Sequence, residues 1–347
     1  MLVERLAEGL LDIIGDVHGE REALETLIDR LGYSPEGLHP KGRRLVFVGD
    51  LCDRGPDSPA VIRLVQSWVT SGRAQVIAGN HELNLLRGER KHGNHWFYGT
   101  SYHADFGDCV AISAKERGPM LDFFRSLPIV LERSDLRVVH AAWIDSAINA
   151  CRTIDRPLDA AYQEFDAKMT SDPGFRALKD RRGEELHRLA TALTDASKVP
   201  AAVAIGPFDE FVQMGNPIRI TTSGVERATQ RPFFASGKWR YVDRVAWWHE
   251  YAGRIPVLFG HYWRWWNPGA HQALSKGEPQ LFADDCVAPF MAEHHSAFCI
   301  DFSVGSRYKE RRLRDKPPYQ GRLAAMRWPE RTLVFDGAAP GHWISSQ

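Results

Sequence analysis

The chain has 347 residues, and 44 Lys and Arg balance 44 Asp and Glu, so the formal net charge is zero. This balance gives no broad basic surface for nucleic acid or an anionic membrane, and a composition of 44% hydrophobic and 25% charged residues excludes a disordered chain. Five scattered cysteines without a CxxC pair argue against a disulfide framework and against a thiolate zinc site. Charges interrupt every apolar run before the ~18 residues of a membrane helix, so we expect a reduced, cytoplasmic protein without a membrane partner.

Three apolar runs alternate with two amphipathic helices over the first eighty residues. Helical spacing of apolar side chains predicts one helix over residues 20–31. Ser58-Pro59 is typical of an N-cap followed by proline at the first position of the second helix. The apolar runs span residues 10–15, 44–49 and 74–79, and they precede Asp16, Asp50 and Asn80. The alternation favours an α/β sheet with right-handed crossovers.

Two later apolar runs also end in a polar residue. Residues 136–139 precede His140, and residues 255–260 precede His261. Ligands of open α/β sheets sit outside the carboxyl ends of the strands. Two aspartates, one asparagine and two histidines at such positions indicate a metal site rather than packing.

Residues 144–243 depart from this pattern. Residues 157–198 are polar and helical in composition, with expected breaks at Pro173-Gly174 and Gly183, whereas residues 199–243 look mixed and loop-rich. We interpret residues 144–243 as an insertion or cap within a single domain that covers residues 1–347. Surface helices of the main fold are the alternative. Strand-like runs within residues 297–336 indicate that the chain then rejoins a sheet.

Three glycine-flanked motifs carry the polar residues: GDVHG at 15–19, GDLCDRG at 49–55 and GNHE at 79–82. Their glycines permit tight turns and close approach of the backbone. With the two later histidines, the motifs resemble those of the phosphoprotein-phosphatase branch of the calcineurin-like metallophosphoesterases. The sequence is similar to bacterial diadenosine-tetraphosphatase-like enzymes and to the phosphatase module of bacterial polynucleotide kinase-phosphatases. The resemblance covers roughly residues 10–145 and 244–336.

The resemblance implies an α/β fold, a calcineurin-like β-sandwich flanked by helices, here with a largely helical insertion. It also implies two divalent ions that clamp a phosphate and acidify a water, so that metal-bound hydroxide attacks phosphorus directly. Asp50 would bridge the two ions. Manganese or an iron-containing pair is expected, with iron, nickel, cobalt and zinc as alternatives. The implied ligands are Asp16, His18, Asp50, Asn80, His140 and His261.

The same resemblance assigns catalytic roles to three further residues. His81 would protonate the leaving oxygen, with Asp53 orienting its ring. Arg54 would bind phosphate oxygens, as would Asn80. A structural ion pair of Asp53 with Arg54 is the alternative reading.

The sequence departs from protein phosphatases where they carry an arginine, since Ala78 stands at that position. Arg244 is a candidate replacement that would bind substrate, and Arg87 is another. Either could instead be an ordinary surface charge. Residues 262–266 (YWRWW) form either a stacking wall for a planar leaving group or a hydrophobic plug, and we favour the plug. Residues 92–98 are expected at the rim of the substrate site.

We expect an enzyme, a binuclear metal-dependent phosphoesterase that hydrolyses phosphate monoesters, diesters or anhydrides. Among these activities, we favour that of a serine/threonine-protein-phosphatase-like enzyme. The alternatives are a dinucleoside polyphosphate (diadenosine tetraphosphate) hydrolase and a nucleic-acid-end phosphatase. The sequence has no P-loop, which argues against a complete polynucleotide kinase-phosphatase. A non-catalytic phosphate-binding regulatory protein on the same scaffold is the alternative of another class.

Overall fold

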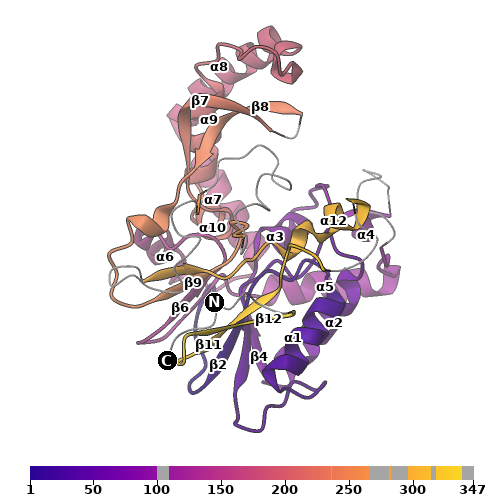
Figure 1. Ribbon diagram of the computed structural model, residues 1–347. Helices are drawn as coiled ribbons and strands as arrows, with labels where there is room; N and C mark the ends of the chain where they lie inside the picture. The colour runs from indigo at the N-terminus through magenta and orange to yellow at the C-terminus, as the bar shows by residue number, and fades with distance from the viewer. Residues whose placement is uncertain (100–108, 236, 266–280, 283–295, 314–317, 338–347) are drawn as a thin grey trace.

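The computed structural model describes residues 1–99, 109–235, 237–265, 281–282, 296–313 and 318–337. Figure 1 shows a layered core with a lobe that projects from one side. The core contains two five-stranded sheets. The first has the order β12-β11-β2-β3-β4, with bounds Thr332–Phe335, Ala324–Trp328, Leu11–Ile14, Arg44–Phe47 and Ala74–Val76. The second has the order β1-β5-β6-β9-β10, with bounds Val3–Arg5, Val130–Glu132, Arg137–Val139, Val257–Phe259 and Ala297–Cys299.

Alternate residues of the short strands enter two different hydrophobic layers, because successive side chains of a strand point to opposite faces. Val46 of β3 is buried between the sheets with Val138 of β6 and Leu258 of β9. Its neighbour Phe47 faces the helices, where its ring stacks on Trp68 with centroids 6.2 Å apart. This arrangement is the β-sandwich flanked by helices that the sequence predicted, with the five predicted strands divided between two sheets.

Helices cover the outer faces of the sandwich. α1 (Arg21–Leu31) and α2 (Ser58–Thr70) pack beside the first sheet. α2 begins one residue earlier than predicted, because the side chain of Asp57 accepts a hydrogen bond from Ala60 N and so provides the N-cap. Among the described residues, none of the helices is both long and apolar enough to cross a membrane. The remaining core helices are α3 (Asn80–Leu86), α4 (His95–Tyr98), α5 (Ala114–Ser126) and α12 (Arg307–Leu313).

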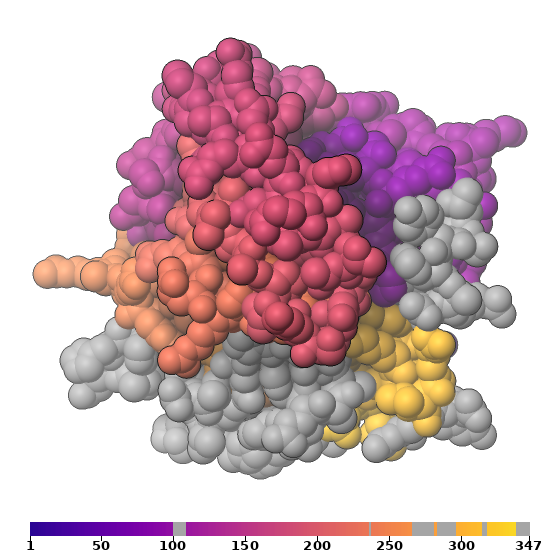
Figure 2. Space-filling model, turned by 90° about the horizontal axis from the view of Figure 1, so that it is seen from above, coloured from indigo at the N-terminus to yellow at the C-terminus, as the bar shows by residue number. Residues whose placement is uncertain are grey.

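The segment between β6 and β9 forms the projecting lobe (Figure 1). When the molecule is viewed from above, this lobe occupies the middle of the visible face (Figure 2). Pro173 begins α8 as predicted, but Gly183 lies inside that helix and does not break it. Residues 199–243 are not loop-rich, since two helices and a hairpin occupy most of them. The elements are α6 (Asp145–Cys151), α7 (Leu158–Ser171), α8 (Pro173–Leu189), α9 (Ile205–Met214), α10 (Pro217–Ser223), β7 (Glu226–Ala235) and β8 (Lys238–Arg244).

Candidate metal centre

The candidate metal centre lies where strands of both sheets end. The side chains that follow β2, β3, β4, β6 and β9 meet there, as do their glycine-flanked loops. All are buried except that of Asn80, which is half-buried at the start of α3. The structure thus brings together five predicted ligands from two sheets: Asp16, Asp50, Asn80, His140 and His261.

The backbone at this centre is strained. His18, Asp50 and His261 have φ angles of 49°, 48° and 72°, a left-handed conformation that costs a non-glycine residue about 1–3 kcal/mol. The glycines leave room for the carboxylates. A Cβ on Gly79 would lie 2.2 Å from Asp50 Oδ1, and a Cβ on Gly260 would lie 2.0 Å from an oxygen of Asp16. Such strain is maintained where it positions functional groups.

Asp50 faces two groups of potential ligands. Its Oδ2 lies 3.8 Å from His18 Nε2 and 3.8 Å from His81 Nε2, and its Oδ1 lies 3.4 Å from His140 Nε2. Asp16 joins the first group, with its Oδ2 3.8 Å from His18 Nε2. One carboxylate between two groups is the arrangement that a bridging ligand requires.

The second group converges on the amide oxygen of Asn80. That oxygen lies 3.2 Å from His140 Nε2 and 2.9 Å from His261 Nδ1. One ligand atom from each of Asp50, His140 and His261 lies within 4.8 Å of the others, as holds for His18, Asp50 and His81. His261 Nε2 is buried without a hydrogen-bond partner, a rare condition that calls for an explanation such as an ion or water nearby.

Backbone carbonyl groups set the tautomers of two predicted ligands, His18 and His140. His18 Nδ1 donates to Cys52 O at 3.1 Å, and His140 Nδ1 donates to Val48 O at 2.7 Å. Because a carbonyl can only accept, each neutral ring carries its lone pair on Nε2. His140 Nε2 lies 3.4 Å from Asp50 Oδ1. In contrast, His18 Nε2 accepts from Arg54 and has oxygens of Asp16 and Asp50 at 3.8 Å. Lone pairs and carboxylates that face one another fit a shared cation. The carbonyl contacts match the way metal-binding histidines are usually oriented.

The electrostatics of the carboxylates also call for cations. Burial, and then the nearby Asp301, raise the pKa of Asp16 well above its usual range. Burial acts in the same direction on Asp50, but the charges of His140 and His81 hold the pKa of Asp50 well below its usual range. Burial disfavours protonated His140, yet Asp50 raises the pKa of that ring to about 10. Asp50 and His140 thus each stabilise the charged form of the other in the buried centre.

A second chain of contacts ends on His81. His81 Nδ1 donates to Asp53 Oδ2 at 2.5 Å, and Trp96 Nε1 donates to Asp53 Oδ1 at 2.6 Å. The backbone N–H of Asp53 donates to Ser58 Oγ at 2.9 Å. Asp53 is fully buried, so these bonds fix its carboxylate and, through it, the orientation of the His81 ring.

The Calcineurin-like phosphoesterase family model matches residues 10–187, just over half of the chain. The chain belongs to this family. The family is one of phosphoesterases, and its members use divalent metals. The two clusters of carboxylate and imidazole groups in this chain fit such ions.

Curated relatives match part of the metallophosphoesterase. It is 54% identical over 79 residues to bis(5'-nucleosyl)-tetraphosphatase PrpE [asymmetrical] of Halalkalibacterium halodurans, covering 22% of this chain and 32% of the relative. It is 34% identical over 158 residues to the symmetrical bis(5'-nucleosyl)-tetraphosphatase of Janthinobacterium sp. (strain Marseille), covering 44% and 51%. The chain thus spans about a third of the first relative and about half of the second. A solved structure titled as a putative diadenosine tetraphosphatase aligns with 96% of each chain, at 18% identity and a TM-score of 0.42.

The predicted phosphate-binding arginines lie in three different places. Arg54 Nη1 donates to His18 Nε2 at 2.6 Å, and because Asp53 bonds elsewhere, the two do not form the structural pair considered as an alternative. Arg244 of β8 lies close to the centre, since its charge, after burial, lowers the pKa of His261 well below the usual range. Arg87 directly follows α3 and pairs with Glu89 at 2.6 Å.

The aromatic segment after His261 is mostly a plug, as favoured from the sequence. Tyr262, Arg264 and Trp265 are buried, and Arg264 Cζ lies 4.7 Å from the ring of Phe298. The partly exposed ring of Trp263 instead faces Arg54, with Cζ 4.8 Å from its centroid. The last residue of the segment, Trp266, lies outside the described residues. The predicted rim at residues 92–98 is wrong for its two buried aromatics, Trp96 and Phe97.

Three supporting residues were not found from the sequence. Asp301 follows β10 and accepts from Trp263 N and Ser303 N, at 2.8 Å each. Glu82, inside the GNHE motif, accepts from the backbone N–H groups of Asp50, Leu51 and Gly79 at 2.8–2.9 Å. Trp96 holds Asp53 as described above. Only Asp301 had a usable signal, because it too follows a short apolar run.

Proposed function

We propose that this metallophosphoesterase hydrolyses dinucleoside polyphosphates at a binuclear metal centre. The observation that carries the binuclear proposal is the position of Asp50, whose two oxygens face separate groups of ligand atoms. The names of the curated tetraphosphatases, which match part of this chain, support the substrate class. In this proposal the centre takes manganese, held by Asp16, His18, Asp50, Asn80, His140 and His261.

The proposed roles follow from contacts on the protein side. When bound, the ions neutralise the phosphate and acidify a water molecule. His81, with its Nδ1 proton held by Asp53, presents Nε2 toward Asp50 and is placed to give a proton to the leaving oxygen. Arg54 points into the same group and can donate two hydrogen bonds to a phosphate oxygen pair. Arg244 brings a further positive charge beside His261.

The serine/threonine phosphatase activity expected from the sequence remains a second candidate. The core motifs fit it equally, but the curated relatives reported above are named as tetraphosphatases. A cytoplasmic location and a cap formed by residues 144–243 are also parts of the proposal. The lobe bears on substrate choice because its residues Tyr162 and Arg219 line a pocket together with Asn80.

A screen of metals against substrates tests the proposal. Protein stripped of metal is reloaded with manganese, iron, nickel, cobalt or zinc. Each form is then assayed with diadenosine tetraphosphate, a phosphoserine peptide, a 5'-phosphorylated oligonucleotide and p-nitrophenyl phosphate. We expect kcat/KM to be highest for diadenosine tetraphosphate with manganese. A higher value for the phosphopeptide would replace the proposal by the second candidate, and absence of turnover with every metal would refute both.

A further inference from the structure

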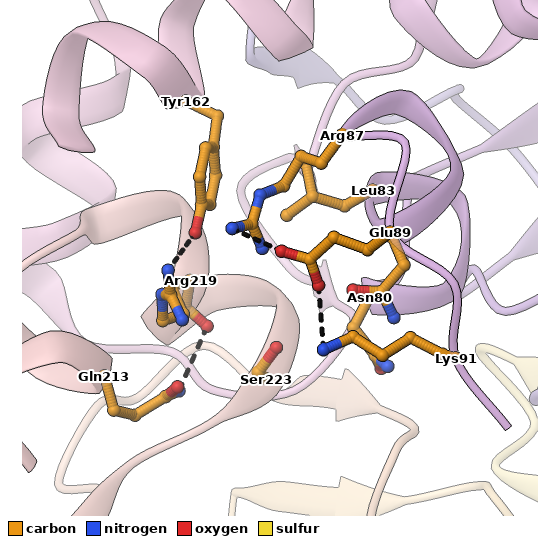
Figure 3. Close-up of a pocket in the computed structure, with 10 residues that line it drawn as sticks. Asn80, Leu83, Arg87, Glu89, Lys91, Tyr162, Gln213, Arg219 and Ser223 are labelled. Carbon is orange, nitrogen blue, oxygen red and sulfur yellow. Dashed lines mark hydrogen bonds and ion pairs between the residues drawn. The ribbon is translucent and has the colours of Figure 1, made fainter. Parts of the chain in front are cut away.

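A polar pocket of about 230 Å³ opens beside Asn80, between the core and the lobe. α3 and the loop after it line one side, and residues of α7, α9 and α10 line the other (Figure 3). Of its ten described lining residues, Leu83 alone is apolar. The pocket therefore adjoins a candidate metal ligand and suits a hydrophilic group.

The lining carries an excess of positive charge. Arg87, Lys91 and Arg219 face a single lining carboxylate, that of Glu89. Glu89 is shared, with its oxygens 2.6 Å from Arg87 Nη2 and 2.8 Å from Lys91 Nζ. Arg219 Nη2 lies 3.5 Å from Asp166 outside the lining, but its Nε is buried without a hydrogen-bond partner. In a chain of zero net charge, this local excess favours an anion.

Tyr162 of α7 orients the two arginines. Its ring lies 4.3 Å from Arg87 Cζ and 5.5 Å from Arg219 Cζ, and its hydroxyl accepts a hydrogen bond from Arg219. These contacts hold the guanidinium groups near each other, as Figure 3 shows. Since Arg87 comes from the core and Arg219 from the lobe, the pocket requires both parts of the chain.

We propose that this pocket binds the phosphate groups that follow the scissile phosphate of a dinucleoside polyphosphate, an inference that rests on the proposed function. Asn80 belongs both to the pocket lining and to the candidate metal centre. When one phosphate of the substrate lies at the metal centre, the next phosphates along the chain therefore reach the pocket. Pockets that enclose a whole small molecule usually measure about 300–1,000 Å³ and are mainly apolar. This one is smaller and polar, which suits part of a polyphosphate chain and not a base.

The experiment compares substrates that do and do not carry a second phosphate. Arg219→Gln and Lys91→Gln each remove one cation, and Lys91, with a side chain 51% exposed, can be replaced without disturbing packing. Arg181→Gln, exposed on α8, is the matched control. For diadenosine tetraphosphate, we expect kcat/KM to fall about tenfold relative to p-nitrophenyl phosphate in both pocket variants. The control should keep the wild-type ratio. Equal losses on both substrates would overturn the assignment.

A phosphoserine peptide has a single phosphate, so its turnover should follow that of p-nitrophenyl phosphate. A loss as large as for diadenosine tetraphosphate would overturn the polyphosphate assignment. Calorimetry with a methylene-bridged bisphosphonate gives a readout that needs no turnover, with methylphosphonate as the single-phosphate comparison. We expect either pocket variant to weaken bisphosphonate binding about tenfold. Unchanged affinity would refute the pocket, whereas absent turnover with intact, variant-sensitive binding would refute only the proposed function.

Discussion

Asp50 lies between the two groups of candidate ligands, and its charge is needed by both. Asp50→Asn keeps the shape of the side chain but removes the negative charge and one acceptor oxygen. We expect metal affinity to fall more than about 100-fold, since even residues behind the ligands cost 10–100-fold, and turnover to be lost. Metal content after dialysis, measured by mass spectrometry, checks this. Asp122→Asn, whose side chain is 74% exposed, is the control. Two retained ions with full activity would exclude the bridging role.

His81 lies close enough to Asp50 to act either as a ligand or as a proton donor. If it donates the proton, His81→Ala should slow substrates with poor leaving groups by about 10²–10⁴-fold. p-Nitrophenolate leaves with little need for protonation and should be affected much less. Steady-state kinetics on both substrates is combined with metal analysis. Loss of an ion, or equal loss on both substrates, would make His81 a ligand instead.

Trp96 is a positioning residue, because it acts on His81 only through Asp53. Trp96→Phe keeps the aromatic packing and removes the 2.6 Å hydrogen bond to Asp53 Oδ1. We expect kcat for a poor leaving group to fall about tenfold with little change in KM. Trp328→Phe is matched, since it removes an indole bond to Asp135 at the end of β11 that pairs with Leu11. A change in KM alone, or the same effect in both variants, would contradict the role of Trp96.

The site residues that could be predicted from the sequence are those that closely follow a strand. Asp16, Asp50 and His261 could be predicted because an apolar run precedes each one and a glycine adjoins it. Trp96 could not be predicted, because only the folding of the chain brings it next to Asp53, and no spacing in the sequence indicates that contact. The same holds for Arg219, which reaches the pocket from the lobe.

At the scale of elements, most core strands were predicted to within a few residues, because a buried strand needs a largely apolar run, but β1 and β5 were missed. The lobe was harder to predict. α8 continues through Gly183, since one glycine costs a helix only about 1 kcal/mol and neighbouring residues can compensate. β7 was missed because most of its residues are half-buried, so it lacks the clear alternation of a strand with one buried face.

Glu185 of α8 joins two helices of the lobe. Its carboxylate accepts from Val203 N, Ala204 N and Ile205 N at 2.7–3.1 Å, at the start of α9. Burial opposes ionisation, but these bonds lower the pKa of Glu185 below its ordinary 4.5. A depressed pKa means that the carboxylate stabilises the fold above pH 4.5 and that this stability is lost as pH falls through the lowered value.

We therefore expect the start of α9 to open in acid. Hydrogen exchange of the three amides should show protection that falls below about pH 4.5 in the wild type. Glu185→Gln should have lower protection at pH 7 and little further loss in acid. Glu184→Gln, at an exposed neighbouring position, should behave like the wild type. Protection that is independent of pH in the wild type would exclude this capping role.

At the scale of the whole molecule, a strand from the last part of the described chain pairs with one from the first part. β11 pairs antiparallel with β2, with Met326 opposite Ile13. Local periodicity could predict both strands but not their pairing, because nothing in a short apolar run identifies a partner about 300 residues away. The neutral net charge likewise hides the uneven distribution of charge, with cations gathered beside Asn80 and buried carboxylates at the strand ends.

Arg43 secures this closure of the sheet. It is buried, and its guanidinium donates to Asp12 Oδ2 of β2 at 2.8 Å, to Glu330 Oε1 after β11 at 2.6 Å and to Leu11 O at 2.6 Å. Arg43→Ala would leave the buried Asp12 carboxylate without this partner. Breaking one side of a buried ion pair costs about 3–5 kcal/mol, so the midpoint of urea unfolding should fall markedly. Arg5→Ala is the control, because its ion pair with Glu8 is exposed and is worth about 0–1 kcal/mol. If both variants unfold at the wild-type midpoint, closure of the sheet does not depend on Arg43.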